Sequence, residues 1–216
     1  RGINFKIDIE GIENIPLRGP IILAPHHVHD HNDPLLLTAV INRNLHFLGS
    51  SEVFFTYPFT QWIFHKLGVL PFHRDPNKFG ERILREKQGL EEFGKKHTRG
   101  SIKKVITLLR YGECVVIFPE ADTINNPTFS RDADFLDPFL GSVYFAVIVK
   151  KKYNIDVPII PIGIKYLDAS YKNVLLRIGK PYFIPARVGD QDWQEIKKEL
   201  NYFARLIFNE IRALSL

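Results

Sequence analysis

The sequence predicts an α/β domain built around a largely buried sheet. Short apolar segments with the character of strands alternate with segments of helical period. Three of the apolar segments, 21–24, 115–118 and 158–164, are typical of short buried strands. The 216 residues and the 45% hydrophobic content are enough for one domain with a sizeable core. We therefore expect residues 1–216 to form a single domain. Because the sequence does not begin with Met, we expect a natural N-terminal segment, such as a membrane anchor, to precede it.

The best-defined unit runs from a helix through a tight turn into a strand. Ser101 is predicted to cap the helix and Gly112 to end it. The apolar face of this helix consists of Ile102, Val105, Ile106 and Leu109. The strand at 115–118 then leads into the sequence FPE at its carboxyl end. In open α/β sheets, ligands bind at that end of the strands.

Two further segments complete the predicted layout. Residues 76–100 are charged, contain Gly and lack strand signals, so we expect a surface excursion without chemistry. At 191–214, apolar residues at helical spacing predict an amphipathic helix packed on the core. The apolar stripe consists of Trp193, Ile196, Leu200, Phe203 and Ile207.

Composition narrows the classes of function. Lys plus Arg exceed Asp plus Glu by five, and the pI is near 9.2. This positive charge favours the binding of anions such as phosphorylated substrates and acidic lipid headgroups. Nucleic acid is not expected as a partner, because the basic residues form no sustained stripe with interleaved aromatics. The single cysteine, Cys114, excludes an internal disulfide and is predicted to be a buried structural thiol. The longest apolar stretch, 139–149, is too short to cross a bilayer, which takes about 20 residues.

Residues 26–34, HHVHDHNDP, gather side chains that can titrate or bind metal. Pro34 suits the first turn of a helix, which makes Asp33 a natural N-cap. A histidine a few residues upstream can fold back toward this carboxylate. Such a contact would orient the imidazole ring and stabilise the imidazolium that forms when the histidine takes a proton.

Two other interpretations of this segment stay open. In the first, Asp33 only caps a helix and the histidines are exposed to solvent. In the second, the histidines at alternate positions hold a metal ion with carboxylates from distant strands. The residues available for such a metal site are His27, His29, His31, Glu120 and Asp122.

Three further segments place polar or proline residues in or after apolar runs. GVLPFHRD at 68–75 has Arg74 after a short strand, and a guanidinium can bind phosphate through two parallel hydrogen bonds. IFPEAD at 117–122 delivers Glu120 at the tip of an apolar strand. VPIIPIG at 157–163 contains two prolines that cannot donate ladder hydrogen bonds, which predicts an edge or irregular strand.

In order and spacing, the four segments resemble the glycerolipid acyltransferase superfamily, whose best-known members are the 1-acylglycerol-3-phosphate acyltransferases. The resemblance extends from about Gly11 to Pro185. The family signature is a His and an Asp separated by four residues, but that register would require a histidine at Val28. Members that read NHPxxxxDPLLL have five intervening residues, and in this HX5D register His27 pairs with Asp33.

The resemblance implies a fold and a catalytic pair. The fold would be a mixed, largely parallel central sheet flanked by helices, like that of glycerol-3-phosphate acyltransferases. His27 would be the general base and Asp33 its orienting partner. In the same register, His26 takes the position of the family's Asn.

Substrate-binding roles are implied in the same way. Arg74 corresponds to the arginine that contacts the phosphate of the acyl acceptor, with His73 assisting. The third segment, IFPEAD at 117–122, implies that Pro119 and Glu120 bind the acceptor. The fourth segment, VPIIPIG at 157–163, corresponds to a strand that lines the acyl-donor side, and Pro161 is its substrate-binding residue.

The implied reaction is direct transfer of an acyl group from a thioester of coenzyme A or acyl carrier protein to a lysophosphatidate hydroxyl. Glycerol 3-phosphate or another lysolipid is the alternative acceptor, because Ala121 replaces the family's Gly in the third segment. The resemblance implies no metal and no organic cofactor. The lipid substrate and the aromatic segment 53–68 imply association with the cytoplasmic face of a membrane. The rival functions are a metal-dependent hydrolase that uses the histidine cluster and an inactive, lipid-binding member of the fold.

Overall fold

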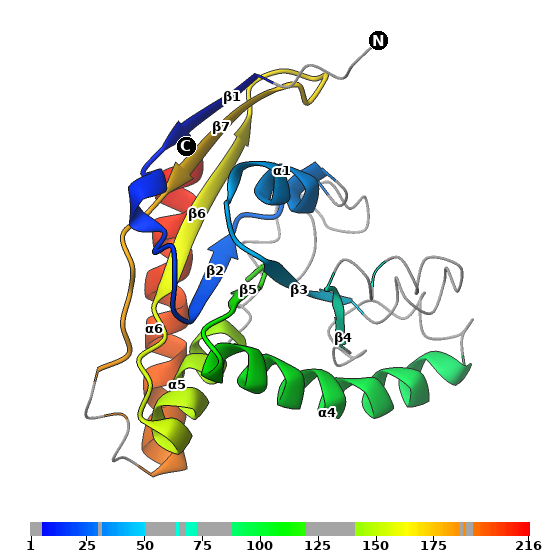
Figure 1. Ribbon diagram of the computed structural model, residues 1–216, viewed down its shortest axis with the longest axis vertical. Helices are drawn as coiled ribbons and strands as arrows, with labels where there is room; N and C mark the ends of the chain where they lie inside the picture. The colour runs from blue at the N-terminus through cyan, green and yellow to red at the C-terminus, as the bar shows by residue number, and fades with distance from the viewer. Residues whose placement is uncertain are drawn as a thin grey trace.

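The protein, seen here in a computed structural model, folds around one twisted sheet (Figure 1). The structure describes residues 6–29, 32–50, 64, 68–72, 88–119, 141–185, 188 and 192–216. Within these residues the sheet has seven strands in the order β1-β7-β6-β2-β5-β3-β4. The strands are β1 (Lys6–Glu10), β2 (Ile21–Pro25), β3 (Leu45–Ser50), β4 (Leu70–Phe72), β5 (Cys114–Val116), β6 (Ile159–Tyr166) and β7 (Asn173–Ile178). Of their pairings, that of β6 with β7 is antiparallel and the others are parallel. The mixed, mostly parallel sheet confirms the predicted fold class.

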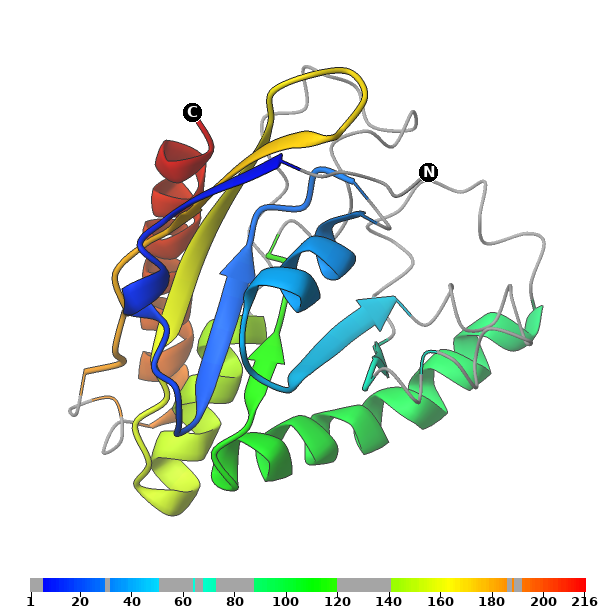
Figure 2. The ribbon, with the colours of Figure 1, turned by 45° about the horizontal axis from the view of Figure 1, so that its top comes forward.

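Helices cover both faces of this sheet (Figure 2). One face carries α1 (Asn32–Val40), and a short 3-10 helix, η1 (Ile12–Asn14), follows β1. The opposite face carries α4 (Gln88–Arg110), α5 (Gly141–Tyr153) and α6 (Trp193–Ser215).

β2 shows how the two layers share one strand. Ile21 and Leu23 point into the layer of α1, whereas Ile22 and Ala24 point into the layer of the other three helices. All four residues are fully buried. Burial on both faces explains why the strand is a continuous apolar run rather than an alternating one.

The helix before β5 is longer than the sequence predicts. α4 begins at Gln88 rather than at Ser101, so residues 88–100 of the predicted excursion are helical. The remainder of that excursion, 76–87, lies outside the described residues. Ser101 is buried within the helix, and its hydroxyl donates to the carbonyl of Pro71 instead of capping a terminus. The polar composition of 88–100 is compatible with this helix, because a helix that packs through one stripe leaves its other sides to polar residues.

The other end of α4 agrees with the prediction. Gly112 adopts a left-handed conformation with φ of 83°. The N–H groups of Gly112 and Glu113 donate to the carbonyls of Leu109 and Leu108, which is the Schellman pattern. Glycine suits this position because a side chain would strain the left-handed backbone. The predicted apolar face is buried or half-buried.

β6 lies in the middle of the sheet, between β7 and β2, so it is not the edge strand that its prolines suggested. The other alternative, an irregular strand, agrees with the structure, because the ladder with β7 stops at Ile162 and only an isolated bridge, Ile159↔Tyr182, follows among the described residues. Pro161 is tolerated because its missing N–H lies beyond the last β6–β7 pair, Ile162↔Ile178. At that point the carbonyl of Pro161 accepts from the N–H of Gly179. Pro158 precedes the strand and takes no place in its ladder.

The C-terminal helix agrees with the prediction. Asp192 caps α6 by accepting hydrogen bonds from the N–H groups of Gln194 and Glu195. The apolar stripe of α6 packs into the core. Its buried residues, among those whose side chains the structure describes, are Ile196, Leu200 and Ile207.

Cys114 is fully buried, as predicted for a structural thiol. Burial raises the pKa of this thiol to about 12, so it stays protonated at neutral pH. Among the helices that the structure describes, none combines the length and the apolarity that crossing a membrane requires.

Candidate active site

The carboxyl ends of three neighbouring strands converge at one edge of the sheet. β2 leads into residues 26–29, β5 leads into Phe118 and Pro119, and β6 ends at Tyr166. Because β2 is parallel to both of its neighbours, these segments meet on the same edge. Helix α1 begins close to the end of β2 and returns Asp33 to this edge. Open α/β sheets bind their ligands in this position.

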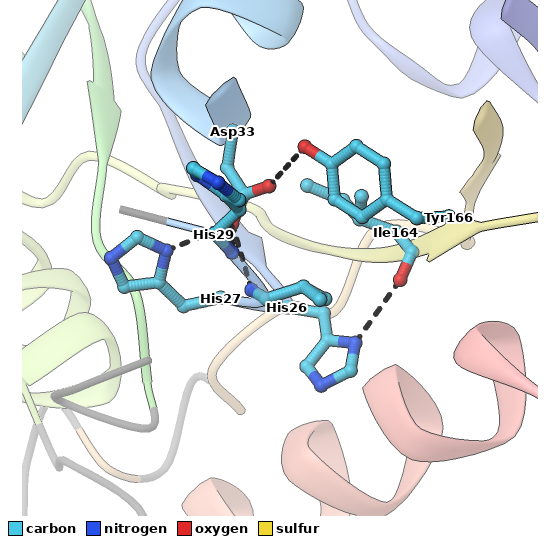
Figure 3. A network of polar contacts seen from close by, with 7 residues as sticks. His26, His27, His29, Asp33, Ile164 and Tyr166 are labelled. Atoms are coloured by element: carbon cyan, nitrogen blue, oxygen red, sulfur yellow. Dashed lines mark hydrogen bonds and ion pairs between the residues drawn. The ribbon is translucent and has the colours of Figure 1, made fainter. Parts of the chain in front are cut away.

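Asp33 lies at the centre of this arrangement (Figure 3). Its side chain is fully buried. Oδ2 accepts from Nδ1 of His27 at 2.9 Å and from the backbone N–H groups of Val28 and His29 at 2.7 and 2.8 Å. Oδ1 accepts from the hydroxyl of Tyr166 at 2.7 Å. These donors hold the carboxylate in one orientation and replace the water that it loses on burial.

The carboxylate of Asp33 does not cap α1 as predicted. Asp33 is the second residue of the helix, and its side chain accepts from N–H groups upstream of the helix. Pro34 lies in the first turn as expected, where its missing N–H has little effect. Residues 26–29 therefore fold over the start of the helix, and they are half-buried rather than exposed to solvent.

His27 is held from two sides. Its Nδ1 bonds to Asp33, and because an ionised carboxylate can only accept, Nδ1 carries the proton in the neutral ring. Its ring also stacks on Phe118, with centroids 3.9 Å apart and an interplanar angle of 23°. Nε2 points away from Asp33 (Figure 3). This geometry suits a base that takes a proton at Nε2 while Asp33 stabilises the resulting charge.

The neighbouring histidines make different contacts. His26 bonds through Nδ1 to the carbonyl of Ile164 at 3.2 Å. Burial lowers the pKa of His26, and the bond to Ile164 partly opposes that shift. The ring of His29 packs edge-on against Tyr171, with centroids 4.9 Å apart. Its Nδ1 is buried and has no hydrogen-bond partner within the described residues. His27 is thus the histidine whose ring bonds to Asp33, in the register that the sequence predicts.

Sequence patterns alone do not assign Tyr166 to the site. This residue is 133 positions from Asp33 and belongs to none of the four motifs. Burial, and to a smaller extent the hydrogen bond to Asp33, raises the pKa of the Tyr166 phenol far above its ordinary value. The hydroxyl therefore stays protonated and acts as a donor. Its position just after the fourth motif was the only available signal, and that signal is weak.

The remaining residues with predicted substrate roles fall into two groups. Pro119 is buried directly after Phe118, and Pro161 is buried in β6 opposite Ala24 of β2. Both belong to chain segments that lead to the site. The predictions for His73, Arg74 and Glu120 lie outside the described residues, as does most of the aromatic segment 53–68.

The metal site is the other use that the sequence suggests for these histidines. Within the described ranges, no group of three or more His, Cys, Asp or Glu side chains is arranged to hold a metal ion. The further ligands of the predicted cluster, His31, Glu120 and Asp122, lie outside those ranges. What the described residues build is the pair of His27 and Asp33.

A histidine bonded to a buried aspartate at the carboxyl edge of a mostly parallel sheet defines an α/β protein with a His–Asp site. Residues 6–165, more than half of the chain, match the family model described as Acyltransferase. The chain therefore belongs to the acyltransferase family, as its motifs predict.

A solved structure has a similar fold. It is the crystal structure of the 1-acyl-sn-glycerophosphate (LPA) acyltransferase PlsC from Thermotoga maritima, which matches with a TM-score of 0.54 and 19% sequence identity. The match covers 97% of this chain and 73% of that chain. At this level of identity the likeness supports the fold. A comparison with curated proteins finds no match.

Proposed function

We propose that the protein transfers an acyl group from an acyl thioester to the hydroxyl of a lysophosphatidate or a related glycerophospholipid acceptor. The family and the fold give acyl transfer in general. The observation that carries the finer proposal is the 2.9 Å hydrogen bond between Nδ1 of His27 and the buried carboxylate of Asp33. It leaves Nε2 as the basic nitrogen and directs it away from the carboxylate.

In the proposed mechanism, Nε2 of His27 takes the proton of the acceptor hydroxyl. The oxygen attacks the thioester carbonyl carbon, a C–O bond forms and the C–S bond breaks. The thiolate leaves and takes the proton from the His27 imidazolium, which regenerates the base. Asp33 stabilises the imidazolium during this step. The mechanism uses neither a metal nor an organic cofactor, and the donor is acyl-coenzyme A or acyl-acyl carrier protein.

Acceptor binding in this proposal depends on the second and third motifs. Arg74, assisted by His73, binds the acceptor phosphate, since a guanidinium pairs with phosphate in two-pronged geometry. Pro119 and Glu120 form the acceptor side of the site. On the other side, Pro161 belongs to the strand that lines the acyl donor.

We further propose that the enzyme works at the cytoplasmic face of a membrane, where a lysolipid acceptor resides. The net charge of +5 supports attraction to anionic headgroups. A flotation assay with anionic liposomes at low salt tests this part separately. Failure to float with the liposomes would overturn the membrane proposal without affecting the chemistry.

The first experiment on the chemistry is thiol release from acyl-coenzyme A with lysophosphatidate, with the lipid product identified by mass spectrometry. His27→Ala should lower kcat by about 10²–10⁴-fold, the usual contribution of a general base. His46→Ala is the matched control, because His46 lies near the start of β3, away from the carboxyl edge of the sheet. Its activity should equal that of the unaltered protein.

Several results would contradict the proposal. Full activity in His27→Ala would assign the base to another histidine. Absence of thiol release with lysophosphatidate, other lysolipids and glycerol 3-phosphate, with either thioester donor, would refute the proposed reaction. Metal analysis of the purified protein then tests the hydrolase alternative.

A further inference from the structure

Neither the sequence motifs nor the family match assigns a role to Tyr166. The matched segment ends at residue 165, and Tyr166 follows as the last residue of β6. We propose that Tyr166 is a positioning residue that acts through Asp33, by fixing the carboxylate that orients His27. This inference rests on the proposed function.

The first argument is the division of donors between the two oxygens of Asp33. His27, Val28 and His29 all donate to Oδ2. Among the described residues, Tyr166 is the donor that reaches Oδ1. A carboxylate can rotate about its Cβ–Cγ bond, and such rotation would break the contact with His27. A hydrogen bond to the second oxygen opposes the rotation and defines the plane in which His27 is held.

The second argument is burial. The Asp33 side chain is fully buried, so water cannot replace a donor that is lost. Without the Tyr166 hydroxyl, Oδ1 would be a buried carboxylate oxygen without its donor. The raised pKa of Tyr166 keeps the phenol protonated across the neutral range, so this donor is always present.

The third argument is that the ring of Tyr166 is itself held in place. Tyr171 packs edge-on against it with centroids 5.2 Å apart, and the ring of His29 lies at 6.5 Å. Tyr171 sits in the β6–β7 turn with φ of 56°, a left-handed conformation that is uncommon for a bulky residue. The carboxylate of Asp168 stabilises that turn by accepting from the N–H and the hydroxyl of Ser170. The β6–β7 hairpin therefore restricts the position of the Tyr166 hydroxyl.

The test is Tyr166→Phe, which keeps the ring and removes the hydroxyl. Because Tyr166 acts through Asp33 and not on the substrates, kcat should fall about tenfold while both KM values stay unchanged. The matched control is Tyr182→Phe. It removes another tyrosine hydroxyl that bonds to a carboxylate, that of Glu210 on α6, and it should leave kcat unchanged. Thermal denaturation establishes that both variants are folded.

A double-mutant cycle separates positioning from general damage. In an Asp33→Asn background the partner charge is already lost, so the further change Tyr166→Phe should reduce kcat by less than twofold. A purely structural role would produce the same tenfold reduction in both backgrounds. That result, or an unchanged kcat in Tyr166→Phe itself, would overturn the proposal.

A spectroscopic measurement keeps the test independent of activity. The proton NMR signal of the His27 Nδ1–H, assigned by its absence in His27→Ala, should shift in Tyr166→Phe and stay in place in Tyr182→Phe. If the unaltered protein transfers no acyl group, the proposed function fails, but a shifted signal still supports the positioning role. A signal that does not move in Tyr166→Phe would overturn that role.

Discussion

The two oxygens of Asp33 are held by different kinds of contact. Oδ2 is bound by donors four to six positions upstream, within the loop that joins β2 to α1. Oδ1 is bound by Tyr166, which comes from the end of β6 and is 133 positions away. The contacts of Oδ2 lie within one loop, whereas the contact of Oδ1 requires β6 to be paired beside β2. One carboxylate therefore links a local motif to the global fold.

The largest expected effect on stability comes from removing both oxygens of Asp33 together. Asp33→Ala would leave the buried donors on Val28, His29 and Tyr166 without an acceptor, and we expect a loss of about 3 kcal/mol of unfolding free energy. Asp33→Asn should lose about 1 kcal/mol or less. Its amide oxygen can replace Oδ2, and its NH₂ group can donate to the oxygen of Tyr166.

Urea denaturation of the two variants tests this prediction. Equal losses would show that the hydrogen bonds do not determine the stability of the site. In both variants acyl transfer should be strongly reduced, because the charge that stabilises the His27 imidazolium in the proposed mechanism is absent in each.

The same contrast explains how much of the fold follows from the sequence. The buried strands, the Gly112 cap and the stripe of α6 are local patterns, and the structure contains them all. The start of α4 was misjudged, because a polar helix segment and a polar loop have similar compositions. The place of β6 was misjudged for another reason. Proline excludes a ladder donor, but only the register shows that Pro161 lies beyond the last β6–β7 pair.

The site shows the same limit. The pairing of His27 with Asp33 could be predicted because both residues lie in one short segment with a recognisable spacing. The role of Asp33 as a cap was wrong, since nothing in the local pattern shows which way the carboxylate turns. Tyr166 could not be found, because its proximity to Asp33 depends on strand order and register.

His26 provides a smaller, pH-dependent test of the link between the loop and β6. Its pKa is lowered from 6.5, mainly by burial. Below pH 6.5 the unfolded chain therefore binds this proton more readily than the folded protein does. The stabilising effect of neutral His26 is complete above pH 6.5 and declines as the pH falls toward the lowered pKa.

We expect His26→Asn to make the fall in unfolding free energy with decreasing pH less steep, because Asn does not titrate. The slope of unfolding free energy against pH should decrease by no more than about 1.4 kcal/mol per pH unit, which is the limit for the binding of one proton. Urea denaturation from about pH 5 to about pH 8 measures it. His46→Asn is the control and should keep the full decline. An equally steep decline in His26→Asn would assign the effect to another group.

The smallest effect on stability is expected at Tyr171, where two contributions oppose each other. Its left-handed backbone, with φ of 56°, is strained by about 1 kcal/mol or more, and Asn adopts that conformation more easily. Its ring packs against Tyr166 and His29, and each such contact contributes about 0.5–1.5 kcal/mol. Tyr171→Asn should therefore change the unfolding free energy by less than about 1 kcal/mol. It should nevertheless loosen the ring of Tyr166, so the His27 Nδ1–H signal should broaden or shift although stability is nearly unchanged. A signal identical to that of the unaltered protein would show that Tyr166 is oriented by β6 alone, and that the contact of Oδ1 depends on the strand rather than on the turn.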